Sequence, residues 1–426
     1  MSSQPRSQDR SFSRNLQYYK FCAYGFLKNL RFYEPFLMLF FLEKGLSYAQ
    51  IGGLYAAREI FINVMEIPSG LMADALGRRM TMAVSFLAYI GSFVVFYFAA
   101  DYWLLFAAMA AYAFGDAFRT GTHKAMIFDY LNSRGWKHLR THYYGHTRSW
   151  SQRGAGVSAL IAAALVFHHR SYAPVFLFTI IPYVLDLILI MTYPANLDGP
   201  RHGSNRTVRD EFAAVIGSLI ASMRNPAALR AISNQALYSG YYKACKDYLQ
   251  PILKSVALSL PLLAALAGEE RTAVVTGLVY SLLYFATAAA ARRSGNLADR
   301  YAGLAIPLNA TLLIGVGFGL LSGAFQRLGL PAIAVMPFVG IYLLENLRKP
   351  MGIAYVSERM NEESLASALS VESQAETLFA ALIALLLGLF SSLFGLGIGL
   401  MLVSALCGLT GYLIRLPVED APLELP

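Results

Sequence analysis

The feature that most constrains this chain is a succession of apolar runs separated by short polar segments. Several runs reach the roughly 20 apolar residues that a membrane-spanning helix requires. Of the 426 residues, 56% are hydrophobic and only 14% are charged, whereas an average soluble domain carries about 25% charged residues. The sequence therefore predicts an all-α integral membrane protein.

Hydropathy predicts twelve transmembrane helices, so both termini are expected on one side of the membrane. The first, fourth and seventh spans are the least regular, because charged residues interrupt them. The expected ranges are 18–41, 48–69, 80–100, 103–128, 145–167, 173–194, 229–255, 272–292, 302–324, 332–354, 364–389 and 394–414.

Lysine and arginine are distributed unevenly between the two sides that this topology creates. The side of the termini would hold Arg6, Arg10, Arg14, Arg78, Arg79, Arg134, Lys137, Arg140, Arg201, Arg206, Arg209, Arg292, Arg293, Arg300, Arg359 and Arg415. The other side would hold Lys44, Arg170, Arg271 and Arg327. Because basic loops stay in the cytoplasm, we expect cytoplasmic termini and a multi-pass protein of a cell membrane, of the bacterial inner-membrane type. The same rule explains the net charge of +9 without a nucleic-acid partner.

Weak internal repeats divide the chain into two related halves. The segment Gly70 to Asp74 aligns with Gly295 to Asp299, and further echoes pair Pro35 with Pro251 and Ser151-Gln152 with Ser373-Gln374. Parallel repeats of six helices are one architecture of transporters. We expect two pseudo-symmetric six-helix bundles, at 18–194 and 229–414. A cytoplasmic linker at 195–228 would join them, and the cytoplasmic tails would be 1–17 and 415–426.

The joint between the second and third spans, GLMADALGRR, resembles the loop signature of the major facilitator superfamily, G-x-x-x-D-x-x-G-R-[RK]. This resemblance implies the fold of that family and gating roles for Gly70, Asp74, Gly77, Arg78 and Arg79. The second copy would add Gly295, Asp299 and Arg300, although it lacks the Gly-Arg-Arg ending. Ala75 also departs from the pattern, since an arginine is common there. The alternative to a gating role is that this joint serves only to fix the orientation of the neighbouring helices in the membrane.

Charged side chains inside the predicted spans indicate where a solute would pass. Each costs roughly 2.5–3.5 kcal/mol at the centre of a membrane helix, and such residues normally border a water-filled path. The densest charge falls on spans one, four and seven, which by resemblance line the central cavity of the family. The expected substrate-binding residues are Arg31, Arg58, Arg119, His123, Tyr242 and Lys246, and the expected proton carriers are Glu34, Glu59 and Asp116. An alternative that remains open is that Arg31 and Glu34 form a buried ion pair with each other and serve only helix packing.

Together these features predict a secondary active transporter that works by alternating access. Its solute would be small, polar and organic, anionic or zwitterionic, and protons are the expected coupling ion. No cofactor or metal is expected, and the working unit would be a monomer in the lipid bilayer. Import and export are both open.

Other functions are less well supported by the sequence. A proton-coupled drug or metabolite efflux pump is the main alternative, but the fifth span lacks the proline of the antiporter motif between Arg153 and Leu165. An intramembrane enzyme would need a catalytic set such as H-E-x-x-H, which is absent. A transporter-like receptor would be expected to carry a sizeable soluble domain. ATP-driven transport by this chain is disfavoured because it has no phosphate loop.

Overall fold

The computed structural model describes residues 13–136, 139–198, 226–301, 303–358 and 362–417, together with residues 210, 213 and 217. Throughout these ranges the regular structure is helical. The N-terminal half contains α1 (Leu16–Lys28), η1 (Glu34–Phe36), α2 (Leu37–Glu43), α3 (Tyr48–Leu76), α4 (Arg78–Phe98), α5 (Tyr102–Arg119), α6 (Thr122–Ser133), α7 (Arg140–His169), α8 (Pro174–Met191) and η3 (Ala195–Asp198). The C-terminal half contains α10 (Pro226–Cys245), η4 (Lys246–Tyr248), α11 (Leu249–Ser259), η5 (Pro261–Leu263), α12 (Gly268–Ala298), α13 (Ala305–Arg327), α14 (Pro331–Glu358), α15 (Glu362–Phe394) and α16 (Leu396–Leu413).

Helices occupy each of the twelve predicted ranges, although they differ in character. Within the described residues, six of them are long and apolar enough to cross a membrane, namely α4, α8, α12, α13, α15 and α16. The other ranges hold helices that carry more charge or are broken into shorter pieces. Since charge inside a membrane helix is costly, this second group is where function is expected. The predicted linker at 195–228 falls largely outside the described residues.

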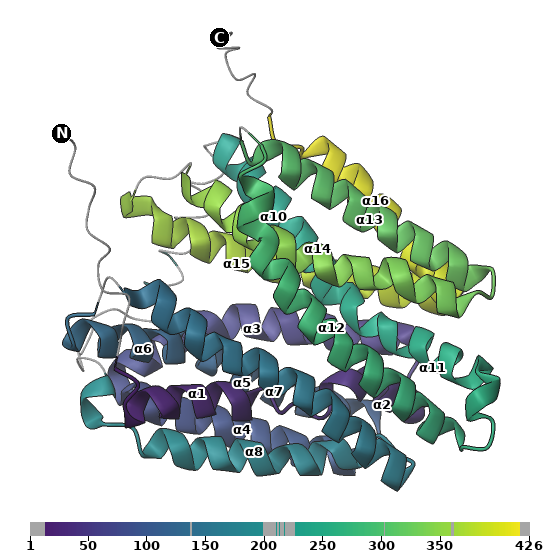
Figure 1. The fold of residues 1–426 in the computed structure, drawn as a ribbon, viewed down its shortest axis with the longest axis horizontal. Helices are drawn as coiled ribbons and strands as arrows, with labels where there is room; N and C mark the ends of the chain where they lie inside the picture. Colours follow the sequence, from purple (N-terminus) through teal and green to yellow (C-terminus); the bar gives the residue numbers. More distant parts are fainter. Residues whose placement is uncertain are drawn as a thin grey trace.

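The two halves lie side by side, with the N-terminal half below the C-terminal half in Figure 1. α1 begins and α16 ends at the same end of the bundle, which we call the terminal face, and the opposite end is the far face. The halves meet mainly where α3 packs on α15 and where α7 packs on α12. A passage between the halves would therefore run from one face to the other.

Three of the predicted spans are broken, and they are the three that charge made irregular. The first span is divided between α1 and the η1–α2 segment, the fourth divides at Thr120-Gly121, and η4 interrupts the seventh. Gly121 has a φ of 84°, a conformation that glycine adopts without the steric cost of a Cβ. Non-helical backbone at membrane depth is tolerated where it is buried in protein or lines a water-filled cavity. The breaks thus point to the same interior region as the charges.

A glutamine side chain repairs the break in the first span. In a continuous helix the amide of Met38 would bond to the carbonyl of Glu34, four residues earlier. Here the Met38 amide donates to Oε1 of Gln250 at 2.8 Å, and Nε2 of Gln250 donates to the Glu34 carbonyl oxygen at 2.9 Å. Gln250 is fully buried. The C-terminal half therefore supplies the hydrogen bonds that the N-terminal half lacks at this point.

Small residues bring the halves into close contact toward the far face. A Cβ placed on Gly52 would lie 2.5 Å from the carbonyl oxygen of Ala384, and one on Gly388 would lie 2.5 Å from that of Tyr48. Such contacts let membrane helices approach closely. Nearby, the Ala49 amide donates to Oγ of Ser392 at 2.7 Å. We call this zone the far seam, defined by α3 residues 48–52 and α15 residues 384–392.

The joint between α3 and α4 is tighter than the hydropathy indicated. α3 continues through the expected boundary at residue 69 to Leu76, because the intervening Leu, Met and Ala residues favour helix. Gly77 then turns the chain with a φ of 88°, and α4 begins at the next residue. A Cβ on Gly77 would lie 3.3 Å from the carboxyl carbon of Asp198. A glycine is thus required here both by the backbone angle and by the neighbour.

Candidate functional site

A cavity of about 210 Å³ lies between the two halves at mid-depth. We call it the central cavity. Side chains from both halves and from the broken first, fourth and seventh spans line it. Its charged lining residues are Arg31, Glu34, Arg58, Glu59, Glu66, Asp116, Lys243, Lys246 and Asp247. A small cavity with this mixture of signs suits a polar solute that carries charge.

One ion pair across this cavity links the broken first and seventh spans. Nζ of Lys246 lies 3.0 Å from Oε1 of Glu34. On the same carboxylate, Oε2 lies 3.8 Å from Nη1 of Arg31. Arg31 and Glu34 are therefore not a closed pair, since a lysine of the other half shares the carboxylate.

A second pair across the cavity joins α3 to α10 and continues into α15. Oε1 of Glu59 accepts from Nη2 of Arg58 at 2.9 Å, and Oε2 lies 3.5 Å from Nζ of Lys243. Lys243 in turn lies 3.0 Å from Glu376, which also binds Lys349 at 3.2 Å. The result is a chain of alternating charges that crosses the interface and runs into the C-terminal half.

Asp116 and Arg119 form the charged cluster of the fourth span. Nη2 of Arg119 lies 2.9 Å from Oδ1 of Asp116, and the Tyr89 hydroxyl donates to the same oxygen at 2.6 Å. Nε of Arg119 donates to the Tyr89 oxygen at 3.2 Å. These groups lie directly before the break at Thr120-Gly121, so the open backbone and the charges are adjacent.

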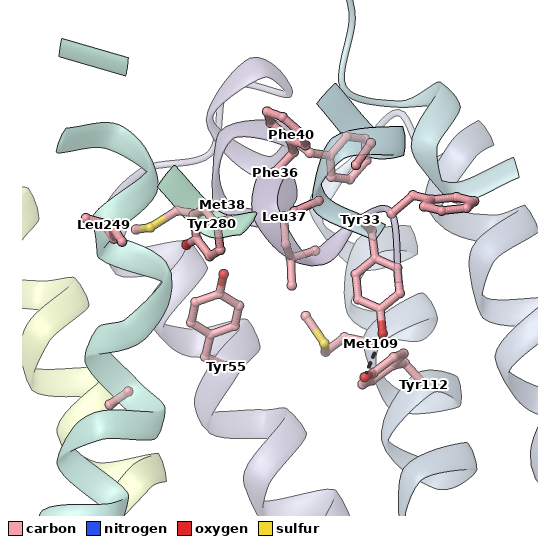
Figure 2. Packing of buried hydrophobic residues seen from close by; sticks show 14 of the residues in the cluster. Tyr33, Phe36, Leu37, Met38, Phe40, Tyr55, Met109, Tyr112, Leu249 and Tyr280 are labelled. Atoms are coloured by element: carbon pink, nitrogen blue, oxygen red, sulfur yellow. Dashed lines mark hydrogen bonds between the residues drawn. The ribbon is translucent and has the colours of Figure 1, made fainter. Parts of the chain in front are cut away.

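The far end of the central cavity is apolar. Tyr33, Leu37, Met109 and Tyr112 line it, and Figure 2 shows their side chains converging below the ring of Phe36. The Tyr33 hydroxyl donates to that of Tyr112 at 2.9 Å. This apolar end would accommodate the hydrocarbon part of a solute whose charged part contacts the ion pairs.

A second cavity, of about 380 Å³, lies within the N-terminal half between α1, α6 and α7. We call it the basic pocket, because its charged lining residues are Lys28, Arg31, Arg119, Lys124 and Arg148. None of the described residues that line it is acidic. Arg31 and Thr120 line both cavities, so the two are neighbours.

The predicted binding and coupling residues distribute between these two cavities. Arg31, Arg58, Lys246, Glu34, Glu59 and Asp116 line the central cavity, whereas Arg119 and His123 line the basic pocket. Tyr242 lines neither and packs edge-on against Tyr342, with ring centroids 5.1 Å apart. Lys243 and Asp247 face the central cavity instead. Lys246 and Asp247 follow Lys243 by three and four residues, a spacing that places side chains on one face, and all three line the cavity. Tyr242 precedes Lys243 by one residue and therefore lies on a neighbouring face.

His123 is held by an aromatic cluster. Its ring stacks on Tyr24 with centroids 3.6 Å apart, and Nε2 lies 3.2 Å from the Tyr193 hydroxyl. Only 9% of the residue is exposed. The contacts of this histidine thus orient it rigidly at one wall of the basic pocket.

The residues of the predicted gate lie at the terminal face. Arg79 binds Asp198 at 2.9 Å and donates to the Tyr193 carbonyl at 2.8 Å, while Arg78 pairs with Asp129. All these partners belong to the N-terminal half. Gly70, Gly295, Asp299 and Arg300 are exposed, and the side chain of Asp74 lies outside the described part of the structure.

Lys28 and Asp186 are two of the buried charges that were not among the predicted site residues. Lys28 is 2% exposed, and its Nζ has no hydrogen-bond partner among the described residues. Asp186 is 0% exposed, and neither carboxylate oxygen has such a partner. Lys28 is the last residue of α1, three residues before Arg31, and Asp186 is the one charge within the apolar helix α8. A search for every charge inside a predicted span would have found both.

Comparison with known proteins identifies the family. A family model of the Major Facilitator Superfamily matches residues 21–373. The uncharacterized MFS-type transporter YxaM of Bacillus subtilis (strain 168) is 22% identical over 377 residues, which cover 85% of this chain and 86% of YxaM.

Solved structures of transporters share the fold across nearly the whole chain. A mutant of the nucleoside transporter NupG superposes with a TM-score of 0.75 at 13% identity, covering 93% of this chain and 98% of NupG. A POT family transporter in complex with 5-aminolevulinic acid superposes with a TM-score of 0.67 at 13% identity, covering 93% of this chain and 94% of that transporter. A bacterial homolog of the human lysosomal transporter Spinster, inward-facing and unoccupied, superposes with a TM-score of 0.68 at 15% identity. The match covers 95% of this chain and 97% of the homolog. The chain belongs to the Major Facilitator Superfamily and is a multi-pass membrane transporter, not an enzyme.

Proposed function

We propose that this transporter carries a small organic solute with an anionic group, either an anion or a zwitterion, by proton-coupled alternating access. The observation that carries the proposal is the pair of ion contacts across the central cavity, Glu34 with Lys246 and Glu59 with Lys243. Each joins a carboxylate of the N-terminal half to a lysine of the C-terminal half. A solute carboxylate entering the cavity would compete for the same lysines.

Such competition couples binding to movement of the halves. While Glu34 and Glu59 hold the lysines, the halves are bound to each other at mid-depth. An anionic solute, or a proton on either carboxylate, would release a lysine and weaken that bond. Because a ligand shifts a conformational equilibrium only by its differential affinity for the two states, contacts that exist in one state alone are what the mechanism needs.

The present arrangement fits a state that is accessible from the terminal face. Hydrogen bonds and ion pairs between described residues join the halves from the far seam to the contact of Gln374 with Glu66, at 3.2 Å. The contacts named here between the halves thus lie at mid-depth and toward the far face. We propose that the termini are cytoplasmic, which makes this state inward-facing, and that the working unit is a monomer.

The ligand bound to one protein with this fold is compatible with such a solute. One related structure holds 5-aminolevulinic acid, which carries an amino group and a carboxyl group. At this low identity the likeness supports only the shape of the passage. The apolar end formed by Tyr33, Leu37 and Met109 also suits an amphipathic metabolite, so efflux of such a compound is the second candidate.

A ligand screen by thermal shift tests this proposal. Purified protein is heated with a panel of amino acids, short peptides, monocarboxylates, nucleosides and apolar cations at two pH values. A ligand at 100 times its Kd stabilises the folded state by about 2.7 kcal/mol, which raises Tm measurably. We expect the stabilising compounds to carry a carboxylate and to act differently at the two pH values. Stabilisation by apolar cations alone would refute the proposal.

Two lysine variants, one inside the central cavity and one outside both cavities, show whether the compounds of the screen bind in the central cavity. Lys246→Met removes the lysine that faces Glu34, and it should abolish the shift produced by the compounds that stabilise the wild type. Lys254→Met removes a lysine that lies over the Tyr172 ring, outside both cavities, and should leave the shift intact.

A further inference from the structure

The basic pocket has features of an anion site that the mechanism above does not use. We propose that it binds an oxyanion group, the carboxylate, phosphate or sulfate of the transported solute, before the solute reaches the central cavity. The proposal rests on the proposed function for the identity of the solute. It adds a binding site that is separate from the ion pairs of the central cavity.

The first support is the sign of the charge around the pocket. Five basic side chains line it, and no described lining residue is acidic. Of the neighbouring carboxylates, Asp116 binds Arg119, and Glu34 is shared by Arg31 and Lys246. Asp186 interacts electrostatically with Lys28 and Arg119 without a hydrogen bond to either, and it does not line the pocket. The remaining positive charge is concentrated on Lys28, Lys124 and Arg148. Concave, low-dielectric sites lined by one sign of charge attract and concentrate ions of the opposite sign.

The second support is Lys28, whose ammonium group lacks a hydrogen-bond acceptor among the described residues. Its Nζ lies 5.3 Å from the ring centroid of Tyr89 and 5.5 Å from that of Tyr183. Such contacts stabilise a cation but accept none of its three N–H groups. The carboxylates of Asp186, Asp116 and Glu34 act on Lys28 electrostatically, but none of them accepts a hydrogen bond from it, and a buried ammonium group without such an acceptor is costly. An oxyanion in the pocket would supply the missing acceptor.

The third support is the break in the fourth span. α6 begins directly after Gly121 and extends over twelve residues. The first amide N–H groups of a helix have no intrahelical partner, and here no side chain caps the N-terminus either. Gly121, His123 and Lys124 all line the basic pocket. The positive end of a helix dipole and free N–H groups favour an anion at this position.

The fourth support is the location of the pocket along the passage. Arg31 and Thr120 line both cavities, so an anion held by Arg31 in the basic pocket is one side chain away from the central cavity. Lys124 and Arg148 are exposed and lie toward the terminal face on α6 and α7. An anion arriving from that face would meet these two residues first and Lys28 last.

Binding of inorganic phosphate to the purified protein tests the proposal. The Tm is measured against phosphate concentration, with sodium chloride added to keep ionic strength constant. We expect a saturable rise in Tm for the wild type. Lys28→Met and Arg148→Gln should each weaken the apparent phosphate affinity by roughly tenfold, because each removes a charge-assisted hydrogen bond.

Matched variants separate this site from other effects. Arg153→Gln removes an arginine of α7 that lies over the Trp150 ring at 5.0 Å and outside the pocket, and it should leave phosphate affinity unchanged. Arg148 is exposed, so its replacement tests the site even if Lys28→Met alters folding. Equal phosphate affinity in the wild type and in both pocket variants would overturn the proposal, as would an equal rise in Tm with chloride alone.

Two further arms distinguish the source of the anion and the dependence on function. Phosphatidylglycerol should not stabilise the protein through Lys28 and Arg148; if it does, the pocket is a lipid headgroup site and the proposal fails. Lys246→Met should retain the phosphate-dependent shift while losing the shift caused by solutes of the screen. If no solute with a carboxylate stabilises the protein but phosphate still does, the proposed function fails and the anion site stands.

Discussion

The interface between the two halves consists of two unlike regions. At the far seam the contacts are neutral and close, with Gly52 and Gly388 permitting backbone approach. Gln250 of α11 adds another neutral contact between the halves, at the broken first span. At mid-depth the contacts are ion pairs around a cavity. Neutral packing offers a solute nothing to compete with, whereas each ion pair can be exchanged for a charged group of the solute. From this difference we expect the seam to stabilise this state and the ion pairs to respond to ligand.

The largest effect is expected at mid-depth. Lys246→Met leaves Glu34 with Arg31, at 3.8 Å, as its one ion-pair partner among the described residues and removes the group for which a solute anion would compete. Truncating one partner of a buried charge pair costs about 2–5 kcal/mol. Uptake into proteoliposomes of the solute found by the screen should fall by roughly a hundredfold. Lys254→Met serves as the control, and equal losses in the two variants would show that the cavity lysine has no special role.

The next effect is expected at Gln250. Replacing it with alanine leaves the Met38 amide and the Glu34 carbonyl without their partners, and each unsatisfied buried group costs about 1–3 kcal/mol. The Tm of the purified protein should fall clearly. Gln326→Ala is the matched control, because Oε1 of Gln326 is already buried without a partner among the described residues. A Tm for Gln250→Ala no lower than that of the control would contradict the repair of the broken helix.

A moderate effect is expected from overpacking the far seam. In Gly388→Ala the new methyl group would lie 2.5 Å from the Tyr48 carbonyl oxygen and 2.9 Å from Cα of Gly52. Overpacking of this kind costs about 1–3 kcal/mol and should lower Tm. Gly91→Ala is the control, because a Cβ there meets no atom within 4 Å. If both variants have the same Tm, the seam is not closely packed.

The smallest effect is expected from the ion pair near the far face between Arg170, directly after α7, and Glu270 of α12. Nε of Arg170 lies 2.8 Å from Oε1 of Glu270, and 66% of the arginine side chain is exposed. Exposed pairs contribute little because water and salt screen them. Arg170→Gln should change uptake by less than about twofold. A loss comparable to that of Lys246→Met would mean that the contrast between exposed and cavity pairs is wrong.

The regular parts of this fold could be predicted from the sequence, and the site could be predicted in part. Length and apolarity locate the helices, and the charges in spans one, four and seven mark the broken ones, because backbone breaks and charge occur together where water enters. Tyr242 and Lys243 show the limit. Both residues lie on α10 before η4, and which of the two faces the cavity depends on how α10 is rotated against the N-terminal half, which spacing alone does not reveal.

The other features that the sequence did not predict were missed for a different reason. Gln250 is unremarkable in the sequence, since its partners are backbone atoms more than two hundred residues away. The partners of Arg78 and Arg79 lie on α6 and η3 and likewise follow only from tertiary packing. Lys28 and Asp186, in contrast, are visible in the sequence as charges inside predicted spans. Only the structure shows that, among such charges, these two are buried without hydrogen-bond partners in the described part of the chain.

The most direct test of the account is the water accessibility of the central cavity from each side of the membrane. Ser373 lines the cavity on α15, whereas Leu378 on the same helix is 56% exposed on the outer surface of the bundle. The three native cysteines are buried, so a membrane-impermeant thiol reagent would report on Ser373→Cys or Leu378→Cys. A tag at the C-terminus identifies the orientation of the vesicles.

The account predicts that the reagent modifies Ser373→Cys from the side of the termini, that modification from the other side is much slower, and that the solute found by the screen protects the cysteine. Leu378→Cys should react slowly from both sides, because it faces lipid. If Ser373→Cys reacts from neither side, or no faster than Leu378→Cys, then the charges at mid-depth do not border a water-filled passage and the account is contradicted.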